Sequence, residues 1–264
     1  MLDRFGRKIN YLRISVIDRC NLRCVYCMPE EGFKLRSHCD ILSFEEIVIV
    51  VKAAIKLGID KIRLTGGEPL VRHNLVALVS MLAQLKIKDL ALTTNGILLA
   101  QYAKALKQAG LQRVNISLDT TDPKYFYEYT RGGDIRKVLA GIDAALQIGL
   151  TPVKLNCVID EKLDHQAQLV KEFAKIKQVE IRFIQKMDFS TGKFISLGSH
   201  GGGDCKNCNR LRLLSDGRIL SCLFSDVTFN TRELGAAKAL QQAILNKPEK
   251  GMPCKERWMG EIGG

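Results

Sequence analysis

The sequence predicts an α/β fold in which a partial (βα)6 TIM-like barrel is followed by a small C-terminal extension. Short β-rich runs alternate six times with helical runs over the first two-thirds of the 264 residues. Glycine follows several of the helical runs, at Gly58, Gly110 and Gly149. This alternation indicates parallel strands with helical crossovers, and six units are fewer than the eight of a closed barrel. A doubly wound open sheet is the alternative arrangement.

Six strands and five helices are expected along this repeat. The predicted strands are Tyr11–Val16, Lys61–Thr65, Asp89–Thr94, Arg113–Leu118, Pro152–Ile159 and Val179–Ile184. The predicted helices are Phe44–Leu57, Asn74–Leu85, Leu98–Ala109, Ile135–Ile148 and His165–Ile176. Polar segments such as Thr65–Glu68, Thr93–Gly96 and Ser117–Asp119 come where strands end. Because ligands of such sheets bind at the carboxyl ends of the strands, we expect the functional site there.

The repeat stops near Asp188, which divides the chain into a barrel of residues 1–188 and a C-terminal region of residues 189–264. A connector rich in glycine and serine covers residues 190–204. Beyond it, a hairpin is predicted across Arg212–Leu223 with its turn at Asp216-Gly217. A helix is predicted near Arg232–Leu245.

Composition and charge limit the classes of protein. The chain has no apolar run of about 18 residues, and its polar start lacks the apolar centre of a secretion signal. We therefore expect a cytoplasmic protein that does not bind a membrane. Forty Lys and Arg against 28 Asp and Glu give a net charge of +12, which indicates either general solubility or a polyanionic partner.

The chain has nine cysteines, an odd number, and no secretion signal, so we do not expect a disulfide framework. We expect instead that some of these cysteines bind metal or take part in catalysis. The first group, Cys20, Cys24 and Cys27, directly follows the first strand. Three thiolates at this spacing can hold one 4Fe–4S cluster and leave one iron open for a reactant. A structural zinc site that lacks a ligand is the alternative, since His38 and Cys39 are a loop away.

A second group of three cysteines lies in the C-terminal region. Its members are Cys205, Cys208 and Cys222. Arg210 and Arg212 follow Cys208 closely and point to the same face of a strand. We therefore expect this group to hold a second cluster with an open iron, which forms a substrate site together with the two cations. A zinc ribbon with a distant fourth ligand such as Cys254 is the alternative. Cys39, Cys157 and Cys254 are isolated and are expected to be small apolar side chains or free thiols.

Cations lie inside the predicted apolar strands. They are Arg13, Lys61, Arg63, Lys154 and Arg182. A barrel interior is normally filled with branched apolar side chains, and buried unpaired charge is unfavourable. Cations on several strands therefore predict a shared polyanion, such as a triphosphate, in the barrel channel. A nucleic-acid binder would instead gather its cations on one helix or arm, so no nucleic acid is expected.

The first cysteine group resembles that of the radical S-adenosylmethionine superfamily, which has Cys-x3-Cys-x2-Cys after the first strand and an aromatic residue, here Tyr26, before the last cysteine. Gly66-Gly67-Glu68-Pro69 strengthens the resemblance, because glycines allow the backbone to approach the methionine moiety and a carboxylate can receive its ammonium. The resemblance implies a barrel of the radical SAM type with an iron–sulfur C-terminal extension. It also implies one-electron cleavage of S-adenosylmethionine to methionine and a 5′-deoxyadenosyl radical.

Nearly the whole chain is similar to the GTP 3′,8-cyclase family, which catalyses the first step of molybdenum cofactor biosynthesis. The segments that carry the similarity are Phe5–Arg7, Leu12–Val16, Asp18–Cys20, Ile62–Leu70, Leu92–Gly96, Val114–Asp119, Ile181–Ile184, Cys208–Arg212 and Ile262–Gly264. In this family the radical removes the ribose 3′ hydrogen of GTP, and the carbon radical adds to guanine C8. The product is 3′,8-cyclo-7,8-dihydroguanosine 5′-triphosphate.

The resemblance assigns roles to residues at matching positions. Cys20, Cys24 and Cys27 would hold the cluster that binds S-adenosylmethionine, and Cys205, Cys208 and Cys222 a second 4Fe–4S cluster that contacts guanine. The implied S-adenosylmethionine pocket contains Tyr26, Gly67, Ser117 and Met187. The implied GTP contacts, mostly to phosphates, are Arg13, Lys61, Arg63, Thr93, Lys154, Arg182, Arg210, Leu211 and Arg212. No catalytic residue beyond the clusters and the cofactor is implied, and the final glycine pair would reach in beside a substrate arginine.

The resemblance also implies partners. They are GTP, a reductant such as flavodoxin or ferredoxin, and the downstream cyclic pyranopterin monophosphate synthase. A homodimer is compatible with it.

Three features depart from the family. The segment between Met187 and Cys205 is several dozen residues shorter, and Gln185 and Asp188 replace a glutamate and a proline. The shorter segment predicts a more open channel. A second hypothesis is therefore a shortened paralogue that uses an auxiliary cluster to modify a peptide, a protein or another substrate. A third is a non-enzymatic zinc or nucleic-acid module.

Overall fold

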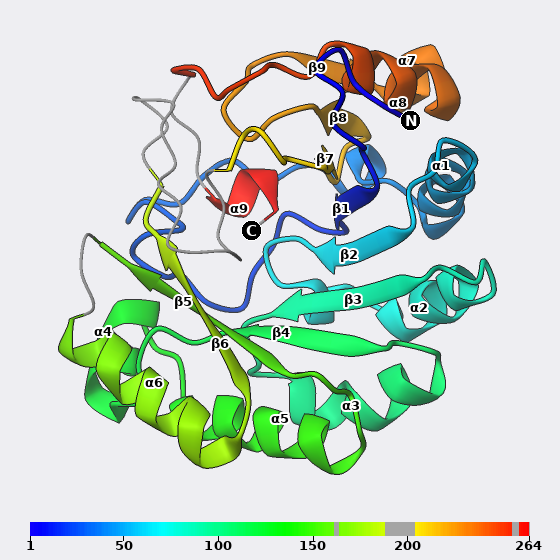
Figure 1. The fold of residues 1–264 in the computed structure, drawn as a ribbon. Helices are drawn as coiled ribbons and strands as arrows, with labels where there is room; N and C mark the ends of the chain where they lie inside the picture. The colour runs from blue at the N-terminus through cyan, green and yellow to red at the C-terminus, as the bar shows by residue number, and fades with distance from the viewer. Residues whose placement is uncertain (161–163, 188–203, 255–258, 264) are drawn as a thin grey trace.

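The computed structural model of the chain describes residues 1–160, 164–187, 204–254 and 259–263. Nine strands of these described ranges form one sheet that curves around an interior (Figure 1). They are β1 (Tyr11–Ser15), β2 (Lys61–Thr65), β3 (Asp89–Thr94), β4 (Arg113–Ser117), β5 (Lys154–Ile159), β6 (Glu180–Gln185), β7 (Arg210–Leu213), β8 (Arg218–Leu220) and β9 (Thr228–Asn230). Their order is β6-β5-β4-β3-β2-β1-β7-β8-β9.

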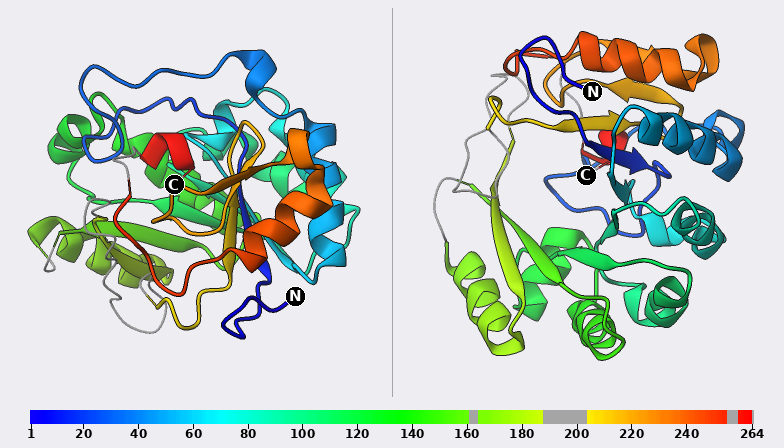
Figure 2. Two further views of the ribbon diagram at one scale, coloured as in Figure 1. Left: turned by 90° about the horizontal axis from the view of Figure 1, so that it is seen from above. Right: turned by 45° about the vertical axis from the view of Figure 1, so that its right-hand side comes forward.

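The first six strands confirm the partial barrel. Each of β1 to β5 pairs in parallel with the strand that follows it in sequence. A doubly wound sheet reverses its strand order among the parallel strands of its repeat, whereas β1 to β6 follow one another without a reversal. The order changes only where β7 of the C-terminal region joins β1, so that alternative is wrong. The helices between these strands cover the outer face of the curved sheet (Figures 1 and 2).

The five predicted helices are present, with ends that differ from the prediction by a few residues. The helical elements are η1 (His38–Asp40), α1 (Phe44–Lys56), η2 (Pro69–Val71), α2 (Leu75–Ala83), α3 (Leu99–Gln108), α4 (Pro123–Thr130), α5 (Ile135–Gln147), α6 (His165–Lys177), α7 (Thr231–Leu234), α8 (Ala236–Leu245) and α9 (Met259–Ile262). Ser43 and Glu46 form a reciprocal capping box at the start of α1. Within the described part of the chain, every helix is too short or too polar to cross a lipid bilayer.

Two helical features differ from the prediction for local reasons. The helix α4 is not among the predicted elements, although Asp122 caps it by accepting a hydrogen bond from the Tyr125 amide and Pro123 occupies its first turn. The helix predicted near Arg232–Leu245 is divided into α7 and α8. Gly235 lies between them with φ 76° and ψ 148°, which is not a helical conformation.

The C-terminal region extends the same sheet. β7 pairs in parallel with β1, and β7 and β8 form the predicted antiparallel hairpin, in which Gly217 takes a positive φ. Apart from Asp204, the predicted connector lies outside the described residues. The boundary at residue 188 therefore stays a prediction.

Alternation along the strands separates the core from the interior of the barrel. On β1, Leu12 and Ile14 are fully buried in the apolar core, whereas Arg13 between them lines an interior cavity. On β7, Leu211 and Leu213 lie in the same core, and Arg210 and Arg212 line the cavity. The sequence pattern thus places cations on one layer inside the barrel.

Candidate functional site

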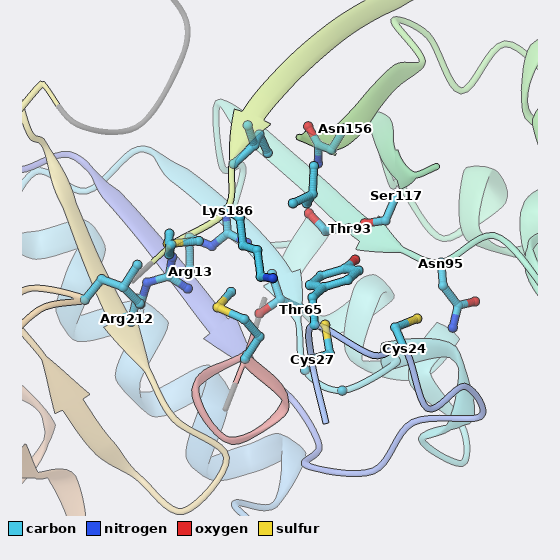
Figure 3. A pocket seen from close by; sticks show the side chains of 18 of the residues that line it. Arg13, Cys24, Cys27, Thr65, Thr93, Asn95, Ser117, Asn156, Lys186 and Arg212 are labelled. Atoms are coloured by element: carbon cyan, nitrogen blue, oxygen red, sulfur yellow. The ribbon is translucent and has the colours of Figure 1, made fainter. Parts of the chain in front are cut away.

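One cavity of about 810 Å³ brings together most of the predicted site residues (Figure 3). Its wall contains all six cysteines of the two groups and the four residues predicted for S-adenosylmethionine. Six predicted substrate residues also line it, namely Arg13, Arg63, Thr93, Arg182, Arg210 and Arg212. Figure 3 shows Arg13 and Arg212 together on one side and Cys24 and Cys27 on the other.

Three predicted substrate residues lie outside the cavity wall. Lys61 and Lys154 are the first residues of β2 and β5, and Lys154 forms an ion pair with Glu180 at 2.5 Å. The Leu211 side chain is 0% exposed and faces the core. A contact between these residues and a substrate stays a prediction.

The first cysteine group lies on the loop that follows β1. The Cys27 amide donates to the Cys24 carbonyl at 3.0 Å, which folds the loop into a turn. Burial raises the pKa of Cys20 to about 11 and that of Cys27 to about 12, and it also raises the pKa of Cys24. Three protonated thiols on one wall can bind iron when they lose their protons.

The donor chemistry of both cysteine groups fits iron–sulfur clusters, because each group supplies three thiols to the cavity wall. Among the described residues, no three His, Cys, Asp or Glu side chains converge on one metal position. The residues of each group are therefore donors on a common wall rather than a preformed metal cage.

The Gly66-Gly67-Glu68 segment holds the loop that leads to Cys20. A Cβ atom on Gly67 would lie 2.2 Å from the Arg19 carbonyl oxygen, and one on Gly66 would lie 2.5 Å from the Ile17 carbonyl oxygen. The Gly67 amide donates to that Ile17 carbonyl at 2.8 Å. Both glycines are therefore required where the chain passes over itself, in addition to lining the cavity.

The expectation that the Glu68 carboxylate receives the ammonium of S-adenosylmethionine stays a prediction, and the structure gives this carboxylate other partners. Glu68 is 1% exposed and lies outside the cavity wall. It accepts hydrogen bonds from the Leu70 and Asn95 amides and the Thr94 hydroxyl. Burial raises the pKa of the Glu68 carboxyl to about 7, and the three hydrogen bonds limit this rise. Glu68 thus fixes the end of β3, from which Asn95 contacts Cys20.

Gly67→Ala is expected to lower the free energy of unfolding by about 3 kcal/mol and to reduce iron incorporation. The added methyl group cannot fit against the Arg19 carbonyl, so the loop that carries the first cysteine group must move. Thermal unfolding and iron analysis of the reconstituted protein measure both effects. Gly132→Ala is the control, since a Cβ there meets nothing within 4 Å and adds only about 1 kcal/mol of backbone strain. Equal losses in the two variants would contradict this account.

The arginine side of the cavity carries concentrated positive charge. Arg13 lies opposite Arg63 on β2 and opposite Arg212 on β7, so like charges face each other across neighbouring strands. Burial lowers the pKa of Arg13, and the charges of Arg212 and Arg63 lower it further. Burial and the charge of Arg210 lower the pKa of Arg212 to about 10. This concentration of positive charge on one wall of the cavity favours a bound anion.

Several polar atoms on the cavity wall have no hydrogen-bond partner among the described residues. They are Arg63 Nε, Thr93 Oγ1, Asn156 Oδ1 and Ser221 Oγ. Buried polar atoms are nearly always hydrogen-bonded, so these atoms indicate where a polar ligand binds. In Figure 3, Thr93, Ser117 and Asn156 lie above Cys24 and Cys27 and to the right of Arg13 and Arg212.

The second cysteine group is held by two buried cations. Arg7 donates to the carbonyls of Cys205 and Glu249 at 2.8 and 2.9 Å. Lys247 donates to the carbonyls of Arg210 and Ser221. Burial raises the pKa of Cys208, but the charge of Lys247 and hydrogen bonds from its neighbours outweigh burial, so that pKa lies below its usual range.

The end of the chain reaches the cavity wall. The Gly263 carbonyl accepts hydrogen bonds from Thr65 Oγ1 at 2.8 Å and from Arg212 Nη1 at 3.3 Å. The final glycines are expected to reach in beside a substrate arginine. Gly263, the one of the two that the structure describes, does lie beside Arg212. Ser15 and Thr65 surround Gly263, which has φ 75°.

Several residues of the cavity wall are not among the predicted site residues, and three of them are polar or charged side chains of interest. Asn156 shares a strand face with Lys154, so the alternation along β5 could have identified it. Asp119 ends the segment after β4 and accepts a hydrogen bond from the Val158 amide, and burial raises its pKa to about 6. Lys247 is a single lysine after a helix, and no sequence pattern distinguishes it.

Sequence comparisons give clear relatives. The family model of the radical SAM superfamily matches residues 14–174. A GTP 3′,8-cyclase of Peptoclostridium acidaminophilum is 45% identical over 86% of this chain and 84% of that protein. A GTP 3′,8-cyclase of Alkaliphilus oremlandii is 40% identical over the full length of both proteins. The second alignment has 328 positions, so that relative has residues with no counterpart in the 264 of this chain.

Solved structures with similar folds are more distant in sequence. Streptococcus suis SuiB bound to precursor peptide SuiA superposes with a TM-score of 0.69 at 15% identity, over 91% of this chain and 65% of that one. The structure of anSMEcpe with bound AdoMet gives 0.64 at 16% identity, over 96% and 85%. At these identities the likeness shows the fold alone.

Proposed function

Because this chain belongs to the GTP 3′,8-cyclase family of the radical SAM superfamily, we propose that it converts GTP to 3′,8-cyclo-7,8-dihydroguanosine 5′-triphosphate in the first step of molybdenum cofactor biosynthesis. One observation carries the proposal. Five arginines and two groups of three cysteines line a single cavity. The cavity would therefore combine a site for a polyanion with two sites for clusters that each leave an iron open.

Cys20, Cys24 and Cys27 would hold the cluster that binds S-adenosylmethionine. When bound there and reduced, that cluster would supply the electron for cleavage of S-adenosylmethionine to methionine and a 5′-deoxyadenosyl radical. Tyr26, Gly67, Ser117 and Met187 would surround the cofactor. Tyr26 is packed against Tyr129, with ring centroids 5.6 Å apart, which fixes the ring beside the cysteine loop.

The arginines would bind the triphosphate of GTP. Arg13, Arg63 and Arg212 lie side by side on neighbouring strands, and Arg182 and Arg210 complete the charged wall. A triphosphate would neutralise this charge and accept charge-assisted hydrogen bonds, including one from the unpartnered Arg63 Nε. Thr93 Oγ1 and Asn156 Oδ1 would be available to the ribose, which lies between the phosphates and the base.

Cys205, Cys208 and Cys222 would hold the second 4Fe–4S cluster, whose open iron would contact the guanine. The proposal also includes a cytoplasmic location, a flavodoxin or ferredoxin as reductant, and transfer of the product to cyclic pyranopterin monophosphate synthase. A homodimer is compatible with it.

The reduced, iron–sulfur-reconstituted protein should be incubated with S-adenosylmethionine and GTP, and the nucleotide products identified by mass spectrometry. We expect 5′-deoxyadenosine and a cyclised product with the mass of GTP, both in amounts that depend on GTP. ATP is the matched control, because it has the same triphosphate and a different base. Formation of 5′-deoxyadenosine that does not depend on GTP, with no cyclised nucleotide, would contradict the proposal.

The charge of the cavity separates this function from peptide modification. A peptide substrate needs no wall of five arginines, whereas a triphosphate does. Tight binding of GTP that Arg210→Ala abolishes would remove support from the peptide hypothesis.

Gly263→Ala is expected to lower formation of the cyclised nucleotide at least about 10-fold. The new Cβ would lie 2.7 Å from Ser15 Cβ at a left-handed φ, so the Gly263 carbonyl would move away from Arg212. We expect cleavage of S-adenosylmethionine to continue, since the first cysteine group is elsewhere on the wall. Gly149→Ala is the matched control, because Gly149 has φ 71° and open space around it. A product yield equal to that control would show that the contact is unimportant.

A further inference from the structure

Lys247 is an unusual residue of the cavity wall because it is a buried cation. It follows α8 and is 1% exposed. Burying an ammonium is costly unless an opposite charge balances it. None of the ion pairs between described residues joins Lys247 to a carboxylate. Its balancing charge is therefore expected among other groups nearby.

The hydrogen bonds of Lys247 connect the two arms of the second cysteine group. Its Nζ donates to the Arg210 carbonyl at 2.8 Å and to the Ser221 carbonyl at 2.5 Å. Arg210 follows Cys208 by two residues, and Ser221 directly precedes Cys222. Two carbonyls satisfy two of the three N–H groups but do not neutralise the charge.

The missing negative charge matches a bound cluster. A 4Fe–4S cluster held by three thiolates carries one net negative charge when oxidised and two when reduced. Lys247 lies on the same cavity wall as Cys208 and Cys222, and its Nζ is held by the carbonyl of the residue that directly precedes Cys222. A nearby cation stabilises the reduced cluster more than the oxidised one.

We propose that Lys247 is the positioning residue and buried counter-charge of the second cluster, which makes that cluster easier to reduce and slower to lose. The inference rests on the proposed function, since it requires a cluster at Cys205, Cys208 and Cys222. Lys247 acts on that cluster through its charge and through the two carbonyls that it holds. The hydrogen bonds from Arg7 fix the third arm, at Cys205.

The test compares Lys247→Gln, which keeps hydrogen-bond donors without the charge, with Lys247→Arg, which keeps the charge. Both are made in the full chain with Cys20, Cys24 and Cys27 replaced by alanine, so that only the second cluster is observed. Electron paramagnetic resonance follows its one-electron reduction by dithionite at controlled potentials, and absorbance follows its loss to a chelator. Lys238→Gln is the matched control, because Lys238 is an exposed lysine on α8.

Lys247→Gln is expected to shift the midpoint potential to a more negative value and to accelerate loss of the cluster on the order of 10-fold. Lys247→Arg is expected to restore most of the potential, and Lys238→Gln to change neither quantity. If the second cluster of Lys247→Gln has the same midpoint potential and the same rate of loss to the chelator as the parent, the inference about Lys247 is wrong while the proposed function stands. A parent protein with no second cluster would overturn both the inference and the second-cluster part of the proposed function.

Discussion

Cys24→Ala is expected to abolish formation of 5′-deoxyadenosine and to lower the iron content from about eight to about four per chain. Cys24 lies between the other two cysteines of its loop, and burial keeps its surroundings poor in water. Two thiols on this loop cannot hold a cluster with a single open iron. Iron analysis after anaerobic reconstitution and chromatography of the reaction products measure the two effects.

Two further variants distinguish this result from general damage. Cys39→Ala removes an exposed thiol on η1 and is expected to leave iron content and cleavage unchanged. Cys222→Ala is expected to remove the second cluster while cleavage of S-adenosylmethionine continues, so the cyclised nucleotide is lost alone. Normal 5′-deoxyadenosine formation by Cys24→Ala would be incompatible with the proposed cluster ligands.

Arg63→Met is expected to weaken binding of GTP roughly 100-fold without destabilising the free protein. Arg63 is 7% exposed and lies opposite Arg13 on the neighbouring strand. Its Nε has no hydrogen-bond partner among the described residues. Burial lowers its pKa, so the folded protein holds this charge at a cost. Replacing such a charge with an apolar side chain is expected to leave the free energy of unfolding unchanged or to raise it by about 1 kcal/mol.

Arg113→Met is the matched control, because Arg113 is a strand arginine outside the cavity that pairs with Asp89. It is expected to show the opposite pattern, with lower stability and unchanged binding of GTP. Calorimetry with GTP and GMP, together with thermal unfolding, measures these effects. The loss of binding affinity caused by Arg63→Met should be larger for GTP than for GMP. Equal losses for the two nucleotides would mean that Arg63 does not bind the outer phosphates.

The sequence predicts the barrel well because its determinants are local. Hydrophobic periodicity locates six strands and their main helices, and cysteine spacing locates both groups on the cavity wall. The residue type of Glu68 does not predict the orientation of its side chain, because that orientation depends on donors at the end of β3 and directly after it. The pairing of β7 with β1 and the position of Lys247 depend on contacts between distant parts of the chain. No local pattern encodes these contacts.

The position of β1 in the sheet has a consequence for fragments of this protein. β1 has β2 on one side and β7 on the other, so the barrel and the C-terminal region share its backbone hydrogen bonds. A fragment that ended before β7 would expose a row of unpaired amides and carbonyls along β1. Such an edge promotes aggregation of the fragment. In the full chain, the barrel and the C-terminal region share β1, so we expect them to unfold in a single cooperative transition.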